Sequence, residues 1–389
     1  MPNLGRAFRK FFGVLERWIG NGQRGFRRAL GLKPPMQIVH YMGHANNHTA
    51  YLMGRVQKKK YLSPPGEEDT KWLNFFMMMR RYCTDERPGA KVRASLAGQE
   101  QILTTDEEGY FEANFELSQP LDASVRLHDI QLELLKPLGR HQHEVRATGK
   151  VQLPPVSPQF GIISDIDDTV IHTGATNFMR MVRVVMLGNA RTRLAFKGVA
   201  AFYKALRAGA SGKSQNPIFY VTSSPWNIYD VVCEVFHTHG IPLGPLFMKD
   251  YGFDETKFIK SSHGSHKLAS IRKILELYPD FPFILIGDSG QKDPEIYREI
   301  VHDFPSRIKA IYIRDVTESP ERDAAVQALG SEVEKTGTSL ILSKDTIAAA
   351  RHAAETGLIN PDALTAIDQD RKHDEAEPTI AEKLLNQQT

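Results

Sequence analysis

Two patterns of hydrophobic and polar positions divide the chain. From about residue 36 to residue 153, short runs alternate between apolar and polar side chains, as at 90–96, 110–117 and 125–135. Alternation with a period of two predicts half-buried strands. Beyond residue 156, short continuous apolar runs alternate with stretches of helical periodicity. We therefore expect a modest β-sandwich first, and then a parallel sheet with helices on both of its faces.

The second region also carries the residues that start and end helices. We expect strands at 160–164, 217–221, 281–286, 308–313 and 339–342, and a helix at 265–277. Three further helices have recognisable boundaries: one opens at Ser224-Pro225 and closes at Gly240, one has Asp293 as its cap before Pro294, and one starts at Ser319-Pro320. This alternation of strands and helices predicts a Rossmann-like α/β domain.

The segments between and outside these regions complete the domain plan. Residues 153–158 are rich in proline and predict a stiff linker. Within the β-rich region, residues 71–82 predict an inserted helix that packs in the core. We expect a basic segment at 1–32, a β-rich domain at 36–153, an α/β domain at 156–357 and a polar, disordered tail at 368–389.

Composition excludes several classes of protein. The net charge of +3 over 389 residues is too small to indicate nucleic-acid binding, and no zinc-finger pattern occurs. Cys83 and Cys233 lie far apart without metal-ligand spacing, so we expect neither a disulfide framework nor a zinc site. No unbroken apolar stretch is long enough to span a membrane, and the N-terminus lacks a secretory signal. We therefore expect a soluble cytoplasmic protein.

The basic segment at 1–32 has an apolar stripe. Its apolar side chains recur at helical spacing: Phe8, Phe11, Phe12, Leu15 and Ile19. Cations lie beside the stripe: Arg6, Arg9, Lys10 and Arg17. A basic helix with an aromatic apolar face can lie in an anionic membrane surface, which would make the protein peripheral to a membrane. A helix docked on its own protein and a disordered arm are the alternatives.

The candidate chemistry lies where two buried strands end. The run 160–164 is followed by Asp165 and Asp167, and the run 281–286 is followed by Asp288. Ligands of open α/β sheets bind at the carboxyl edge, where these side chains would meet. Carboxylates crowded together repel each other unless a cation lies between them, and Mg²⁺ prefers oxygen ligands.

The first acidic pair has two ordinary explanations. A solvated loop after a strand is the usual origin of an isolated pair of this kind, but the second acidic strand end at Asp288 argues against it. An EF-hand loop is excluded, because Val170 stands where that loop needs glycine and Thr176 where it needs glutamate. An active site is the better interpretation.

Each candidate residue suits a role in phosphoryl transfer. Asp165 would be the nucleophile and a metal ligand, and Asp167 would serve as general acid and then base while its backbone carbonyl binds the metal. Thr222 would donate to a phosphoryl oxygen and Lys267 would supply the cation. Lys249, Lys257 and Lys260 remain rivals of Lys267. Asp288 would bind the metal, and Asp293 would contact its water shell or Lys267, unless it only caps its helix.

These residues resemble a known superfamily in their order. The sequence 165–169, Thr222, Lys267 and the stretch from Asp288 to Asp293 are similar to the four motifs of haloacid dehalogenase-type phosphatases. The longer strings 219–226, 266–268 and 287–297 resemble the bacterial form of the actin-patch-associated phosphatidate phosphatase family. The resemblance covers about residues 156–357.

The resemblance implies a Mg²⁺-dependent phosphohydrolase whose reference reaction converts phosphatidate to diacylglycerol. The stretch 177–193 is short for a cap domain, which would suit a substrate presented on a membrane. Two alternatives stay open at this point. The substrate could be a soluble phosphomonoester or a phosphoprotein, or the domain could be a phosphorylatable, receiver-like module without turnover. Receivers, however, carry an adjacent acidic pair after the first strand, unlike Asp165 and Asp167.

Overall fold

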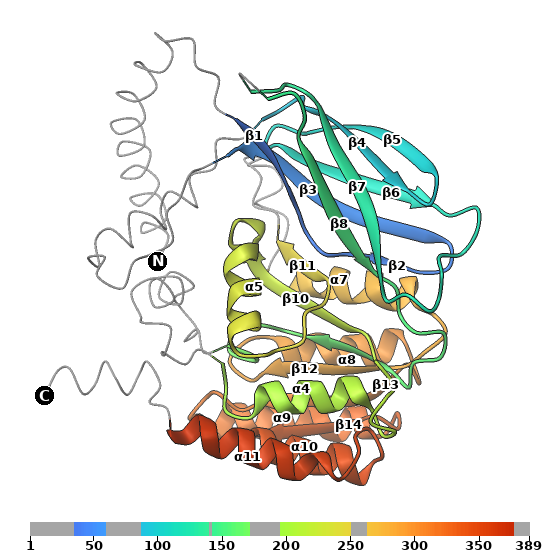
Figure 1. Cartoon of the computed structure of the whole chain (residues 1–389). Helices are drawn as coiled ribbons and strands as arrows, with labels where there is room; N and C mark the ends of the chain where they lie inside the picture. Colours follow the sequence, from blue (N-terminus) through green and yellow to red (C-terminus); the bar gives the residue numbers. More distant parts are fainter. Residues whose placement is uncertain (1–34, 60–86, 140–141, 172–194, 250–262, 377–389) are drawn as a thin grey trace, which may run out of the picture.

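The computed structural model describes residues 35–59, 87–139, 142–171, 195–249 and 263–376. Within these ranges the chain forms two sheets, one in the β-rich region and one in the α/β region (Figure 1). The predicted basic helix at 1–32, the inserted helix at 71–82 and the stretch 177–193 lie outside the described residues. None of the described helices is long and apolar enough to cross a membrane.

The α/β region contains a parallel sheet of six strands in the order β11-β10-β9-β12-β13-β14. The strands are β9 (Gly161–Ser164), β10 (Ile218–Pro225), β11 (Leu246–Lys249), β12 (Phe283–Asp288), β13 (Ile308–Arg314) and β14 (Ser339–Ser343). The chain first moves outward from β9 to β11 and then returns to β12 on the other side of β9. The strand order therefore reverses between β9 and β12, and doubly wound sheets bind ligands at such a point.

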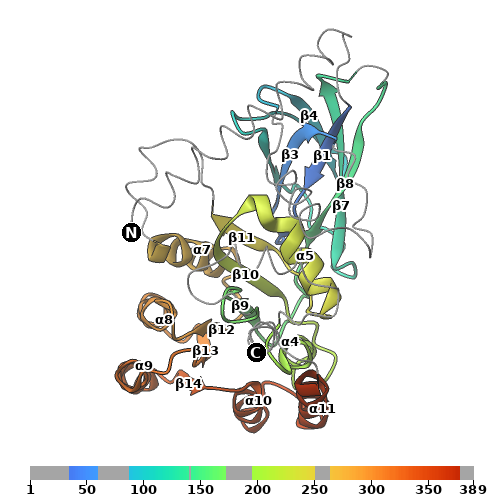
Figure 2. The ribbon, with the colours of Figure 1, turned by 90° about the vertical axis from the view of Figure 1, so that its left-hand side faces the viewer.

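Helices cover both faces of this sheet (Figure 2). One face carries α7 (His263–Leu277), α8 (Asp293–Asp303) and α9 (Pro320–Glu334). The other carries α4 (Val199–Ala208), α5 (Tyr229–Thr238), α10 (Thr346–Glu355) and α11 (Ala363–Ala376). Successive side chains of β9 point to opposite faces, so Ile162 packs in one core and Ile163 in the other. The predicted α/β sheet with helices on both faces is confirmed.

Two predicted boundaries in this region are wrong. Strand β10 continues to Pro225, and α5 begins at Tyr229 after a short 3₁₀ helix (Trp226–Ile228), so Ser224 does not open a helix. Helix α11 continues through residues 368–376, where we expected a disordered tail. A contact with α4 holds the end of this helix: Asp374 accepts a hydrogen bond at 2.7 Å from Gly198 N–H, at the start of α4. The carboxylate thereby satisfies an N–H group that the helix itself leaves unpaired.

The β-rich region forms one curled sheet of eight strands. They are β1 (Met36–His40), β2 (Gly43–Ala45), β3 (Thr49–Lys58), β4 (Lys91–Leu96), β5 (Gln99–Thr104), β6 (Tyr110–Glu116), β7 (Leu127–Lys136) and β8 (Arg146–Gln152). The long strand β3 pairs with β1, β2 and β6, and β2 pairs with β8. These pairings join the strands into one continuous hydrogen-bonded sheet. The predicted sandwich of two separate sheets is therefore not confirmed.

The two regions meet beside the end of β10. Tyr41 of the β-rich region packs against Trp226 and Tyr229, with ring centroids 4.7 Å apart in both pairs. Arg55, which is 3% exposed, donates from Nη1 to Asn227 Oδ1 at 3.1 Å. Because Trp226 and Asn227 directly follow β10, the β-rich region supports the segment that leaves the carboxyl edge of the sheet.

Candidate active site

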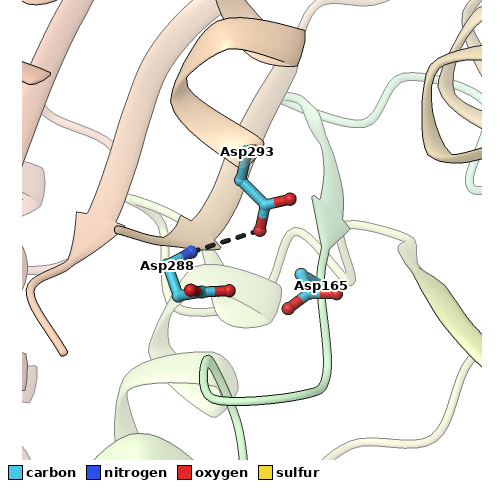
Figure 3. A group of neighbouring side chains, drawn as sticks. All are labelled: Asp165, Asp288 and Asp293. Carbon is cyan, nitrogen blue, oxygen red and sulfur yellow. Dashed lines mark hydrogen bonds between the residues drawn. The ribbon is translucent and has the colours of Figure 1, made fainter. Parts of the chain in front are cut away.

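Three carboxylates meet at the point where the strand order reverses (Figure 3). Asp165 follows β9, Asp288 ends β12 and Asp293 begins α8, and one oxygen of each lies within 4.8 Å of the others. Asp293 Oδ2 also accepts a hydrogen bond from Asp288 N–H at 3.2 Å. Gly287 permits this approach, since a Cβ there would lie only 2.6 Å from Asp293 Oδ2. All three side chains are buried.

Two oxygens of this group have no hydrogen-bond donor among the described residues. They are Asp165 Oδ1 and Asp288 Oδ2. Burial raises the pKa of Asp165 well above its usual range, although the nearby charge of Lys267 opposes the shift. Burial, followed by the charge of Asp293, raises the pKa of Asp288 to about 7. The protein therefore concentrates carboxylates in a site that has too few donors and cations of its own.

Lys267 is the buried cation of the site. It lies on α7, is 3% exposed, and places Nζ 2.8 Å from Asp165 Oδ1 and 2.6 Å from Asp293 Oδ1. The first approach is an ion pair without hydrogen-bond geometry, whereas the second is a hydrogen bond. Burial alone would lower the pKa of Lys267, but Asp165 and Asp293 outweigh it and raise that pKa. Lys267 therefore stays charged beside Asp165.

The segment after Asp165 turns back sharply. Three successive N–H groups, of Thr169, Val170 and Ile171, point to the carbonyl of Ile166. Asp168 adopts a left-handed backbone with φ of 58°, which aspartate tolerates better than most residues. The turn lets Thr169 Oγ1 donate to Asp165 Oδ2 at 3.1 Å. It also directs the side chain of Asp167 away from the three clustered carboxylates.

Asp167 is held by two hydroxyls from β10. Thr222 Oγ1 donates to Asp167 Oδ2 at 2.7 Å, and Ser224 Oγ donates to the same oxygen at 3.0 Å. Burial raises the pKa of Asp167, and these two hydrogen bonds to the ionised form partly offset the rise. Burial therefore favours the protonated carboxyl group of Asp167, and the two hydroxyls favour its ionised form.

The structure brings together six predicted site residues: Asp165, Asp167, Thr222, Lys267, Asp288 and Asp293. The role of Asp293 as a helix cap is wrong, because Lys292 holds that position and no side chain caps α8. The carboxylate accepts hydrogen bonds from Lys267, as expected, and from Asp288 N–H. Of the rival cations, Lys249 ends β11, whereas Lys257 and Lys260 lie outside the described residues.

Sequence reasoning missed two polar residues of the site. Ser224 was expected to open a helix, but its hydroxyl contacts Asp167. Gln291 donates from Nε2 to the backbone carbonyl of Asp167 at 3.2 Å and accepts from Lys267 at 3.2 Å. Their positions in the strings 219–226 and 287–297, close to the motif residues, were the only signal in the sequence.

The side chains present fit a divalent cation. Asp165, Asp288 and Asp293 offer an all-oxygen donor set, and Asp288 Oδ2 is a buried oxygen without a donor among the described residues. Hard cations such as Mg²⁺ prefer this set over nitrogen or sulfur. The Asp167 carboxylate is not part of the group. Its backbone carbonyl, expected to bind the metal, accepts the hydrogen bond from Gln291.

Comparisons with known proteins find relatives of the segment that carries these residues. Residues 160–315 match the family model described as phosphatidate phosphatase APP1, catalytic domain. Phosphatidate phosphatase APP1 of Saccharomyces cerevisiae is 34% identical over 203 residues, which cover 51% of this chain and 33% of the yeast protein. An uncharacterized protein of Schizosaccharomyces pombe is 26% identical over 244 residues, 62% of this chain and 38% of its own. The matched segments therefore span about a third of the length of these relatives.

Solved structures show only weak similarity. A carbohydrate acetylesterase from Xanthomonas citri aligns over 86% of this chain and 73% of its own, with 10% identity and a TM-score of 0.28. The minor pilin PilB from Streptococcus sanguinis aligns over 70% of this chain and 87% of its own, with 10% identity and a TM-score of 0.25. Neither similarity carries an argument about fold or function. The family match and the yeast relative do carry an argument: the segment 160–315, which holds all six predicted site residues, is similar to the catalytic domain of phosphatidate phosphatase APP1.

Proposed function

We propose that the protein is a Mg²⁺-dependent phosphohydrolase that converts phosphatidate to diacylglycerol and phosphate through an aspartyl-phosphate intermediate. The observation that carries the proposal is the meeting of Asp165 with Asp288 and Lys267 at the reversal of strand order, inside a segment that matches the family. The order of the strand-end residues also supports a domain of haloacid dehalogenase type. The substrate is inferred from the name of the yeast relative, phosphatidate phosphatase APP1.

In the first half-reaction Asp165 is the nucleophile. A carboxylate oxygen of Asp165 forms a bond to phosphorus, and the bond from phosphorus to the diacylglycerol oxygen breaks. Asp167, whose pKa is raised by burial, gives its proton to that leaving oxygen. Thr169 supports the attack, since its hydroxyl donates to Asp165 Oδ2 and fixes the orientation of the carboxylate.

In the second half-reaction water removes the phosphoryl group. The Asp167 carboxylate, now ionised, takes a proton from the water while the water oxygen forms a bond to phosphorus. The bond from phosphorus to Asp165 then breaks, which releases inorganic phosphate and restores both carboxyl groups. Thr222 and Ser224 hold Asp167 in one orientation during both proton transfers.

Positive charge offsets the charge of the phosphoryl oxygens. Lys267 lies beside Asp165 and supplies one such charge from the protein. Asp165, Asp288 and Asp293 would hold Mg²⁺, which when bound supplies the further positive charge that three carboxylates and a phosphate require. Thr222, which now donates to Asp167, has a hydroxyl that can donate to a phosphoryl oxygen when substrate is bound.

A lipid substrate requires access to a membrane surface. We propose that the basic segment at 1–32 provides this contact, on the strength of its aromatic stripe and its flanking cations. Lys and Arg near an anionic leaflet each contribute about 1 kcal/mol of binding free energy.

The test is release of inorganic phosphate by the full chain from a panel of substrates. The panel contains phosphatidate in detergent micelles, a soluble aryl phosphate, a phosphopeptide and acetyl phosphate, each with Mg²⁺ and with EDTA. Metal-dependent release from phosphatidate in preference to the others supports the proposal. Preference for a soluble monoester or the phosphopeptide would overturn the assignment of a lipid substrate. If acetyl phosphate phosphorylates the protein and no inorganic phosphate is released, the proposal that the protein is a hydrolase is wrong.

A further inference from the structure

Gln291 contacts three of the segments that carry the site. Its backbone N–H donates to Asp288 Oδ1 at 2.8 Å, its Oε1 accepts from Lys267 Nζ at 3.2 Å, and its Nε2 donates to the Asp167 carbonyl at 3.2 Å. Asp288 ends β12, Lys267 lies on α7 and Asp167 lies just after β9. One residue thereby links three elements that are far apart in the sequence.

The chemistry of these contacts requires an amide. Lys267 offers only donors and the Asp167 carbonyl only acceptors, so the side chain between them must accept at one atom and donate at the next. A glutamate would turn a negative oxygen toward the carbonyl, and an apolar side chain would remove both hydrogen bonds. Asparagine is one methylene shorter and could reach either Lys267 or the Asp167 carbonyl, but not both. Glutamine meets both requirements without adding charge.

The loop that carries Gln291 is itself fastened from α9. Arg322 donates from Nε to the Ser289 carbonyl and from Nη2 to the Gln291 carbonyl, both at 2.7 Å. Its guanidinium also pairs with Glu295 of α8. A planar guanidinium held by three partners on two elements leaves little freedom to the loop between Asp288 and Asp293. The Gln291 amide is therefore presented from a rigid support.

Gln291 also completes the surroundings of Lys267. The ammonium group has three N–H donors; Asp293 and Gln291 accept hydrogen bonds from it, and Asp165 forms an ion pair with it at 2.8 Å. Without the amide, a buried N–H would lack a partner and the ammonium would be free to move toward either carboxylate. Its position relative to Asp165 would then vary, and the Asp167 carbonyl would lose its only described side-chain donor.

We propose that Gln291 is a positioning residue that sets both the Lys267 ammonium against Asp165 and the Asp167 carbonyl beside the carboxylate group. The proposal rests on the proposed function, since positioning matters only if these groups bind metal and transfer phosphate. Nothing in the contacts requires Gln291 to touch substrate. It acts through Lys267, Asp167 and Asp288.

The test compares the variants Gln291→Met and Gln291→Glu with the wild-type protein, each as the full chain. Methionine keeps the length of the side chain but removes both hydrogen bonds, so we expect kcat and Mg²⁺ affinity each to fall about tenfold to a hundredfold, with KM changed little. Glutamate keeps the acceptor for Lys267 and adds negative charge, so we expect kcat to fall similarly while Mg²⁺ affinity does not fall. Gln327→Glu, at an exposed position of α9, is the matched control.

Mg²⁺ affinity is measured by calorimetric titration without substrate, and thermal unfolding is followed in parallel. The titration separates this proposal from the substrate assignment, because it does not depend on which phosphate ester is cleaved. If Gln291→Met lowers the unfolding temperature yet keeps the wild-type kcat and Mg²⁺ affinity, Gln291 is purely structural and the proposal is wrong. Equal loss of Mg²⁺ affinity in the methionine and glutamate variants would also overturn it.

Discussion

Lys267 Nζ lies 2.8 Å from Asp165 Oδ1 in a pair that is almost completely buried. Breaking this pair should affect catalysis strongly, because in the proposed mechanism Lys267 offsets charge on the reacting groups. We expect Lys267→Met to lower kcat about a hundredfold to a thousandfold, the usual cost of removing one such group. Lys309→Met, at an exposed position of β13, is the matched control and should retain full activity. Wild-type kcat in a folded Lys267→Met protein would exclude Lys267 as the cation.

Removal of Ser224 should change the pH dependence of the reaction. The Ser224 hydroxyl donates to Asp167 and stabilises its ionised form, so Ser224→Ala should raise the pKa of Asp167 further. Because Asp167 must be protonated when the alcohol leaves, the alkaline limb of kcat/KM should move up by about one pH unit. The measurement is a pH profile for wild type, Ser224→Ala and the exposed control Ser331→Ala. An alkaline limb that stays in place or moves down contradicts the role of Asp167.

The stability of the metal-free protein should fall as pH rises. Burial raises the pKa values of Asp165, Asp167 and Asp288 in the folded state, the last to about 7. A raised carboxyl pKa gives stability that is complete below the unfolded value of about 4 and is lost as pH rises through the folded value. For Asp288 the effect is about 4 kcal/mol at most.

Mg²⁺ should offset this loss. We therefore expect the unfolding temperature in EDTA to fall between about pH 5 and pH 8, and the increase produced by Mg²⁺ to grow over the same interval. Asp288→Asn should weaken both trends, because it removes a group that titrates there. If the increase in unfolding temperature produced by Mg²⁺ does not depend on pH, or is the same in Asp288→Asn as in wild type, these carboxylates do not bind the metal.

The sequence predicted the site better than the contacts within it. Asp165 and Asp288 could be placed together because parallel strands end at one edge, and this geometry depends only on identifying the strands. The expected contact of Asp293 with Lys267 is present, whereas its expected role as a helix cap is not, because Lys292 holds the cap position. Ser224 and Gln291 were missed because their contacts with Asp167 depend on where β10 ends and on how the loop after Asp288 turns, and the sequence does not show either. Helix α11 was missed because its apolar pattern is weak, and Asp370 and Asp374 bind the start of α4.

The basic segment at 1–32 should bind anionic membranes. We expect the full chain to sediment with vesicles that contain phosphatidate, and a chain truncated to begin at Lys33 to sediment much less. Binding should weaken as salt rises, because exposed charges are screened over about 10 Å at 0.1 M salt. Deletion should lower activity on vesicles but not on a soluble aryl phosphate. Equal sedimentation of both proteins, or sedimentation that ignores lipid charge, would show that the segment is not the anchor.

The most direct test of the account is turnover by Asp165→Asn. Replacing the nucleophile with a neutral group of the same shape should lower phosphate release from phosphatidate by at least about ten-thousandfold. The variant should remain folded, and without metal it should be more stable than wild type at alkaline pH, because a buried carboxylate with a raised pKa is removed. Asp362→Asn, at an exposed position, is the control and should behave as wild type. The account predicts loss of Mg²⁺-dependent release in Asp165→Asn alone; near-normal release from the folded variant would contradict it.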